Sequence, residues 1–160
     1  MKLQQVRSLI QEMVHGNQQT LDIFRNQIQG PAGRRAYNRM IRNHFAGQDA
    51  SSYGVYIWSD LITDEIYYIG MAGTIKTNGS YGQHDLQSRL TASRGKHPET
   101  GKDIQTNTYI YDFLQRENLD GLRISVYHAL QGEAPAYIEA VLLHYHYKNY
   151  QRLPKLNNSF

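Results

Sequence analysis

The sequence predicts a small α+β domain in which a three-stranded antiparallel sheet is flanked by helices. Residues 54–58 and 66–70 are short runs rich in β-branched and aromatic side chains, separated by a polar turn. A third run, 122–128, alternates apolar and polar residues as a strand does. Helical spacing marks the segments between and after these strands, near residues 85–90, 109–114 and 135–145.

Length and composition limit the class of protein. A chain of 160 residues is long enough to bury a core and is expected to form one compact domain. There is no cysteine, which excludes disulfides and thiolate metal sites and agrees with a cytoplasmic location. No apolar run is long enough to cross a bilayer, so no membrane association is expected.

The net charge of +3 is unevenly distributed. Residues 1–52 contain seven Lys or Arg against three acidic residues, whereas residues 53–160 contain ten against eleven. We therefore predict a basic, helical N-terminal extension over 1–52, with a linker near 47–52, followed by a functional module over 53–160. A basic excess of this kind suits contact with nucleic acid.

Three helices are predicted in the N-terminal extension. Apolar residues at helical spacing indicate an amphipathic helix over residues 2–15, which either provides a dimer interface or caps the core of the module. Leu21, Phe24 and Ile28 indicate a second, shorter helix. The third begins near Pro31, which suits the first turn of a helix. Its polar side carries a stripe of arginines, which is either a solvated face or a DNA-phosphate contact: Arg34, Arg35, Arg39 and Arg42.

The first two strands are expected to form a hairpin centred on Ile62. In this register Tyr56 pairs with Tyr68 on one face of the sheet. The core-facing side chains are then Val55, Ile57, Tyr67 and Ile69.

Four short motifs occur in an order that identifies a family. Gly54-Val55-Tyr56 is followed, eleven residues later, by Tyr68-Ile69-Gly70. Then come Leu86-Gln87-Ser88-Arg89-Leu90, a helical Glu139 and Pro154-Lys155-Leu156-Asn157. Together they span residues 54 to 157 and resemble the GIY-YIG nuclease family, whose fold has the predicted order of strands and helices.

The resemblance implies a role for each motif residue in cleaving a phosphodiester bond. Tyr56 would be the general base, for which nearby positive charge is needed because a free phenol has a pKa near 10. Tyr68 would position the water or the phosphate, and Arg89 would contact the scissile phosphate. Glu139 would bind Mg²⁺ or Mn²⁺, and Asn157 would brace the site.

Two positions depart from the family pattern. Many members have a cation directly after YIG, where this chain has Met71, and His or Tyr four residues after the arginine, where it has Ser93. His97 or Lys76 is the candidate substitute. Both come from loops expected over 71–84 and 94–107, and the second loop would also contact DNA through Arg94 and Lys96.

The predicted function is a Mg²⁺-dependent DNA endonuclease, resembling type II restriction endonucleases, for which a homodimer would supply two active sites. The alternatives are a nucleic-acid-binding module with a decayed site, and a structure-specific repair or phage nuclease. A zinc site at His144 and His146 is not expected, because residues two apart point to different sides of a helix.

Overall fold

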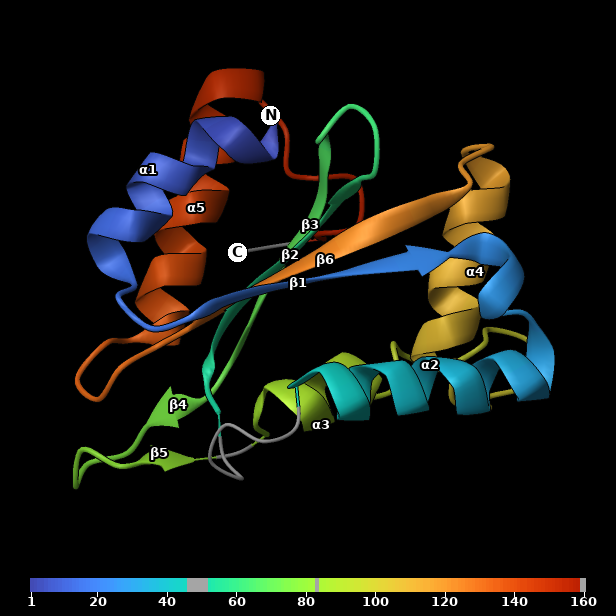
Figure 1. Cartoon of the computed structure of the whole chain (residues 1–160), viewed down its shortest axis with the longest axis horizontal. Helices are drawn as coiled ribbons and strands as arrows, with labels where there is room; N and C mark the ends of the chain where they lie inside the picture. The colour runs from blue at the N-terminus through green and yellow to red at the C-terminus, as the bar shows by residue number, and fades with distance from the viewer. Residues whose placement is uncertain (46–51, 83, 159–160) are drawn as a thin grey trace.

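A computed structural model describes residues 1–45, 52–82 and 84–158 of the chain. The fold is α+β, with four antiparallel strands in the order β1-β6-β2-β3 and helices on both faces (Figure 1). The sheet strands are β1 (Gln18–Phe24), β2 (Gly54–Asp60), β3 (Ile66–Ala72) and β6 (Gly121–His128). The helices are α1 (Leu3–Met13), α2 (Gly30–Phe45), α3 (Leu86–Thr91), α4 (Thr106–Arg116) and α5 (Pro135–Tyr150), with a 3₁₀ turn, η1 (Arg25–Gln27).

The sheet is buried on both faces, and strand β2 shows how the sequence achieves this. Val55 and Ile57 pack with α1 and α5, whereas Tyr56 and Trp58 point to the opposite side and pack with α2, α3 and α4. Because successive residues of a strand face opposite ways, one central strand contributes to both cores. In Figure 1 the α1–α5 pair and the α2–α3–α4 group lie on opposite sides of the sheet.

The predicted second helix is wrong, and so is the three-stranded sheet. Residues 18–24 form β1, which pairs with β6 from Gln18↔Tyr127 to Phe24↔Gly121. Leu21, Phe24 and Ile28 have helical spacing, but Phe24 is 43% exposed and does not belong to the apolar side of the segment. The buried side is set by Ile23 and the half-buried Leu21, which alternate as an edge strand requires.

The N-terminal third is therefore part of the same fold rather than a helical extension beside it. Leu3, Val6 and Ile10 of α1 are fully buried against the sheet and α5. Of the two uses predicted for this helix, capping the core accounts for its apolar face. The predicted linker falls almost entirely on residues 46–51, which lie outside the described residues.

The buried stripe of α5 differs from the predicted one. Ile138 and Leu142 are buried as expected, but Leu143 and His146 replace Val141 and Tyr145. His146 is buried near the C-terminal end of α5, where its Nδ1 is 2.7 Å from the carbonyl oxygen of Arg152. His144 is exposed, so the two histidines do point apart.

The hairpin register is shifted by two residues from the predicted one. Tyr56 pairs with Gly70, and Trp58 pairs with Tyr68. The Asp60 carboxylate accepts hydrogen bonds from the amides of Ile62 and Thr63, which moves the turn along the chain. A bulge follows, at which the Tyr67 hydroxyl donates to Asp60 and its ring joins the Tyr56 side instead of the predicted Val55 side.

The segment after β3 is more ordered than the predicted loop. It contains a small hairpin made of β4 (Thr74–Ile75) and β5 (Tyr81–Gly82). Within the residues described, no helix is long and apolar enough to span a membrane.

Candidate functional site

The two motif tyrosines lie side by side on the sheet although they are not paired directly. They are diagonal neighbours on β2 and β3, with ring centroids 5.8 Å apart. Tyr56 is fully buried, and Tyr68 is half-buried at the edge of the same aromatic group. The shifted register thus keeps the predicted neighbourhood by a different pairing.

Gly70 provides the space that these rings occupy. A Cβ atom at this position would lie 2.6 Å from Cε1 of Tyr68 and 2.7 Å from Cζ and Oη of Tyr56. Any side chain at Gly70 would therefore displace at least one of the two rings. The glycine of the second motif is required by packing on the Tyr56 side of the sheet.

Arg94 lies against both tyrosines. The sequence predicted it as a DNA contact from a loop and did not place it beside them. Its Nη1 donates to the hydroxyl of Tyr68 and its Nη2 to the hydroxyl of Tyr56, each at 3.3 Å. The guanidinium carbon lies 4.9 Å from the ring centroid of Trp58. No carboxylate forms a salt bridge with it among the described residues, and its Nε is buried without a hydrogen-bond partner.

Burial and the neighbouring charges set the protonation states here. Burial alone would lower the pKa of Arg94, but the nearby phenols of Tyr56 and Tyr68 outweigh it and raise that pKa. Arg94 is therefore a permanent cation. Burial, followed by the proximity of Tyr56, raises the pKa of Tyr68, which keeps its hydroxyl protonated near neutral pH.

A cavity of about 370 Å³, here called the arginine cavity, brings together four of the predicted catalytic residues and one predicted DNA contact. These are Tyr68, Arg89, Glu139 and Asn157, and Arg94 joins them. They come from β3, α3, α5 and the C-terminal segment, which are far apart in the sequence. Tyr56 does not line the cavity, because Arg94 lies between its hydroxyl and the open space.

Arg89 and Glu139 also line a second, smaller cavity of about 130 Å³. Its other lining residues are Met71, Ala72, Gly73, Thr74 and His84. Burial raises the pKa of the Glu139 carboxyl, and the positive charge of Arg89 opposes that shift. Arg89 itself is exposed, so its guanidinium is open to a ligand from solvent.

Asn157 is held firmly beside the cavity. Its side-chain oxygen accepts from the backbone N–H of Ile69 at 2.9 Å, and its amide donates to the Ile69 carbonyl at 2.7 Å. The side chain thus pairs with β3 as a neighbouring strand would. This double contact fixes the C-terminal segment against the motif strand.

Three of the predicted site residues lie elsewhere. His97 is exposed on the 94–104 loop, where its N–H donates to the Lys102 carbonyl, and it lines neither cavity. Lys96 is exposed on the same loop, where its backbone forms an isolated antiparallel β-bridge with that of Asp103. Lys76 extends over Gly82 of β5 rather than into the cavity.

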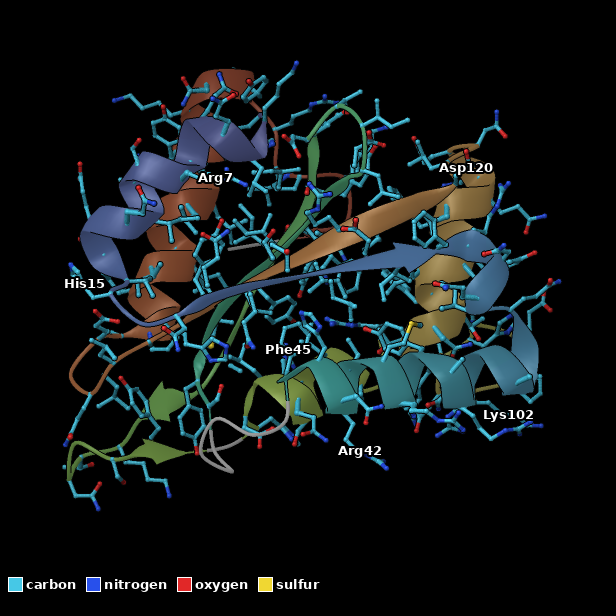
Figure 2. The ribbon with its side chains drawn as sticks, in the orientation of Figure 1. Arg7, His15, Arg42, Phe45, Lys102 and Asp120 are labelled. Carbon is cyan, nitrogen blue, oxygen red and sulfur yellow. The ribbon has the colours of Figure 1, made fainter. Side chains whose placement is uncertain are left out.

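The arginine stripe of α2 is exposed. Arg34, Arg35, Arg39 and Arg42 are all exposed, and none of them forms a salt bridge in the part of the chain that is described. Figure 2 shows Arg42 on the outer side of α2, whereas the buried Phe45 faces the sheet. Both readings of this stripe, a solvated face and a DNA contact, are compatible with this position.

His84 was missed by the sequence reasoning, and the importance of Arg94 was underestimated. A single histidine in a loop without periodicity has no spacing that marks it. Arg94 follows Arg89 by five residues, but α3 ends at Thr91, so helical geometry did not predict where its side chain would lie. Its loop is anchored by the Arg94 N–H, which donates to the Ile104 carbonyl.

No family model matches the chain, and neither curated proteins nor solved structures give a significant match.

A Gly70→Ala variant should test the packing of the two tyrosines. Because the new Cβ would overlap atoms of both rings, we expect a loss of about 1–3 kcal/mol in unfolding free energy and a changed near-ultraviolet aromatic spectrum. Urea unfolding and circular dichroism measure both. Gly82→Ala is the matched control, because its Cβ meets only the flexible end of Lys76. Equal stability of the two variants would contradict this account of Gly70.

Proposed function

We propose that the protein is a divalent-metal-dependent DNA endonuclease similar to the GIY-YIG nucleases. The observation that supports this most is the arginine cavity, where a carboxyl group and a protonated tyrosine hydroxyl meet two arginines that form no salt bridge within the described residues. Arg89 and Arg94 suit a phosphate group, because guanidinium donors match its oxygens. The GIY-YIG resemblance predicted Tyr68, Arg89, Glu139 and Asn157 before their positions were known.

Glu139 is the residue that would hold Mg²⁺ or Mn²⁺. The described residues contain no cluster of three or more His, Asp or Glu side chains, so the remaining ligands would be waters and phosphate oxygens. This suits Mg²⁺, which keeps several waters and uses one or two carboxylates. The ion would neutralise charge that develops on the phosphate. The Glu139 carboxylate also has no hydrogen bond or salt bridge within the described chain.

The protein's own groups would then act on water and phosphate. Arg89 binds phosphate oxygens, and the protonated Tyr68 donates a hydrogen bond to the phosphate or the attacking water. Tyr56, as the phenolate, would take a proton from that water as the water oxygen bonds to phosphorus and the phosphorus–oxygen bond to the leaving nucleotide breaks. Since Arg94 separates Tyr56 from the cavity, it must move toward the phosphate for water to reach the phenol. Arg94 supplies the nearby positive charge that is missing at Met71 and Ser93.

A nucleic-acid-binding module with a decayed site is the second candidate. The buried hydroxyl of Tyr56, behind Arg94, is the observation that favours it. The proposed form of the nuclease is a type II restriction enzyme. It would act as a homodimer, because cutting both strands takes two active sites. A structure-specific repair or phage nuclease is the alternative form.

The first test is cleavage of supercoiled plasmid. We expect the wild type to cut it with Mg²⁺ and to stop on addition of EDTA, and Glu139→Gln to bind DNA but not cut it, because it lacks a metal ligand. Folding raises the pKa of Glu139, so the folded protein holds this carboxyl group less readily in its ionised form. The group therefore lowers the free energy of unfolding once the pH exceeds the ordinary pKa of a glutamate. The Gln variant should therefore be at least as stable at pH 7 in EDTA, measured by thermal unfolding. Glu12→Gln, an exposed change on α1, is the control. Undiminished cutting by Glu139→Gln would refute the metal assignment, and binding without cutting by the wild type would favour the decayed module.

The second test separates the roles of the two tyrosines. Tyr56→Phe keeps the buried ring but removes the proton acceptor, so we expect roughly 10²-fold or more slower single-turnover cleavage with DNA binding retained. Tyr68→Phe should lose less, because a protonated hydroxyl only positions its partner. Small and equal losses would show that neither tyrosine is the base, and His84 would then be the next candidate.

The third test concerns the exposed arginines of α2, which we propose contact DNA phosphates. Changing Arg34, Arg35, Arg39 and Arg42 to Gln should weaken binding to all sequences and make the slope of log K against log salt shallower by about 3 to 4 units. A control with the same charge change uses exposed cations of the α1–α5 layer: Lys2, Arg7, Lys148 and Arg152. If the two sets reduce the slope equally, α2 has no specific contact with DNA.

A further inference from the structure

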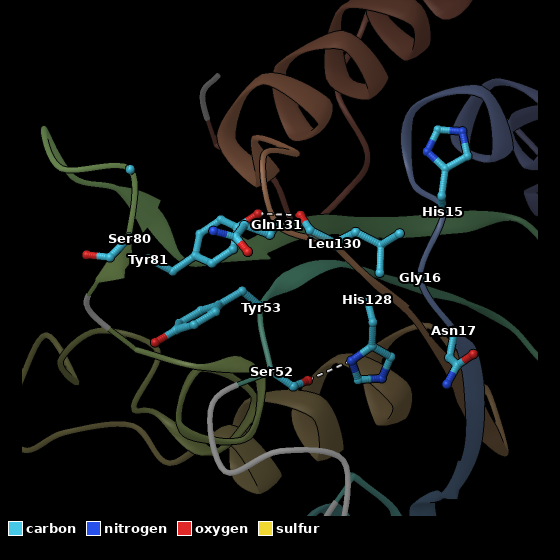
Figure 3. Close-up of a pocket in the computed structure, with 12 residues that line it drawn as sticks. His15, Gly16, Asn17, Ser52, Tyr53, Ser80, Tyr81, His128, Leu130 and Gln131 are labelled. Atoms are coloured by element: carbon cyan, nitrogen blue, oxygen red, sulfur yellow. Dashed lines mark hydrogen bonds between the residues drawn. The ribbon is translucent and has the colours of Figure 1, made fainter.

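A second site lies beside the smaller cavity of Arg89 and Glu139, in a pocket of about 550 Å³ here called the tyrosine pocket. Its volume falls within the usual range for sites that bind small molecules. Figure 3 shows its lining, which comes from the links after α1 and before β2, the β4–β5 hairpin and the segment after β6. None of these residues has a role in the chemistry proposed above.

One wall of the pocket is aromatic and rigid. The rings of Tyr53 and Tyr81 lie 4.8 Å apart at 35°. The Tyr81 hydroxyl lies 2.6 Å from the carbonyl oxygens of both Leu130 and Glu133, which fixes its ring. Tyr53 packs on Gly73, where a Cβ atom would lie only 2.6 Å from the Tyr53 ring. Fixed aromatic faces of this kind can stack on a planar ligand.

The opposite wall is polar and uncharged. His128 is buried, and burial lowers its pKa, so the ring is neutral near pH 7. Gln19 donates its amide to the His44 carbonyl, which turns its oxygen toward His128 Nε2, 2.6 Å away. Nε2 must then be protonated, and Nδ1 accepts from Ser52, also at 2.6 Å. The Ser52 oxygen lines the pocket with lone pairs left to accept hydrogen bonds.

The pocket does not suit a phosphate. Its described lining includes no lysine or arginine. The nearby Glu133 carboxylate is also engaged, with one oxygen on His15 and the other accepting from the Leu130 N–H. A planar ring with polar edges and no charge fits these walls, and a nucleobase is such a ring.

The location connects this pocket with the proposed nuclease site. Gly73, on which Tyr53 packs, also lines the smaller cavity of Arg89 and Glu139. The Ser52 carbonyl accepts from the N–H of Leu86, the first residue of the helix that carries Arg89. Gly73 thus lies next to both the tyrosine pocket and the smaller cavity.

We propose that the tyrosine pocket binds one unstacked nucleobase of the nucleic-acid substrate, next to the phosphate that is cut. This rests on the proposed nuclease function. Taking a base out of a duplex costs a few kcal/mol, and stacking on aromatic side chains offsets much of this. The pocket would thereby favour substrates whose base pairs open easily at the cleavage point.

Amide NMR spectra with adenosine, cytidine, guanosine or thymidine test the pocket without any cleavage. We expect shifts at residues 15–17, 52–53, 79–81 and 128–131 with at least one nucleoside, and none there with inorganic phosphate. Tyr53→Ala should weaken nucleoside binding about tenfold or more, through lost stacking. Tyr53→Phe should bind normally, and so should Tyr145→Ala, a change of an exposed tyrosine on α5. Shifts in the arginine cavity alone, or no shifts with any nucleoside, would overturn the proposal.

A competition experiment identifies the source of the base. If the pocket takes a base of the substrate, the nucleoside that binds should slow plasmid cutting by the wild type but not the residual cutting by Tyr53→Ala. Unchanged cutting would mean that the pocket serves a free nucleoside, and the proposal would be wrong. A wild type that cuts no plasmid would refute the nuclease and with it the substrate base, even where the NMR shifts show that the pocket binds nucleosides.

Discussion

The pairing of β2 with β3 is the constraint on which the rest of the site depends. It places Gly70 opposite Tyr56 and so leaves room for two tyrosine rings and a guanidinium on one side of a buried sheet. The other side of the same strands, with Val55, Ile57 and Ile69, is filled by α1 and α5. Because both faces are buried, a slip of one residue would exchange the two sets of side chains and remove the site together with the core.

Arg94 places a positive charge in the site that no salt bridge of the described chain balances. Arg94 is half-buried, and a cation removed from water is costly unless it is paired, yet no carboxylate in the described chain forms a salt bridge with it. Two phenol oxygens and the face of Trp58 contact its guanidinium instead, and the phenols raise the pKa of Arg94 despite its burial. Arg94 therefore keeps its positive charge at the arginine cavity, which Arg89 also lines. Glu139 supplies one carboxyl group beside these two arginines, and the phosphate that we propose as ligand would add negative charge there.

The sequence predicted the elements with strong periodicity and missed those defined by long-range contacts. The elements α3, α4, β6 and α5 were found near their observed positions because their apolar residues recur at helical or strand spacing. Strand β1 was missed because Phe24 is apolar but exposed, and an edge strand has few buried residues to show its period. The hairpin was placed two residues off because the Asp60 side chain shapes the turn, which hydrophobic spacing does not report.

The same distinction holds for the candidate site. Tyr68, Arg89, Glu139 and Asn157 were predicted because each belongs to a motif in a known order. His97 was chosen by its chemistry alone, and its loop turns it away from the cavity through the contact with Lys102. Arg94 lies five residues after Arg89, but only the contact of its loop with Ile104 directs it back onto the tyrosines. Motif order thus located Tyr68, Arg89 and Glu139 on regular elements and Asn157 in the C-terminal segment. The positions of His97 and Arg94 depend on tertiary contacts that one sequence does not reveal.

The smaller cavity and the tyrosine pocket are best considered together, because the segment 71–74 contacts both of them. Met71 and Thr74 line the smaller cavity of Arg89 and Glu139, while Gly73 between them supports the ring of Tyr53 in the tyrosine pocket. The charged groups Arg89 and Glu139 line the smaller cavity, whereas the described lining of the tyrosine pocket includes no lysine or arginine. A nucleotide has the same division, because its phosphate is anionic and its base is neutral and planar. A strand that crosses the segment between residues 71 and 74 would therefore find its phosphate and its base each in the environment that suits it.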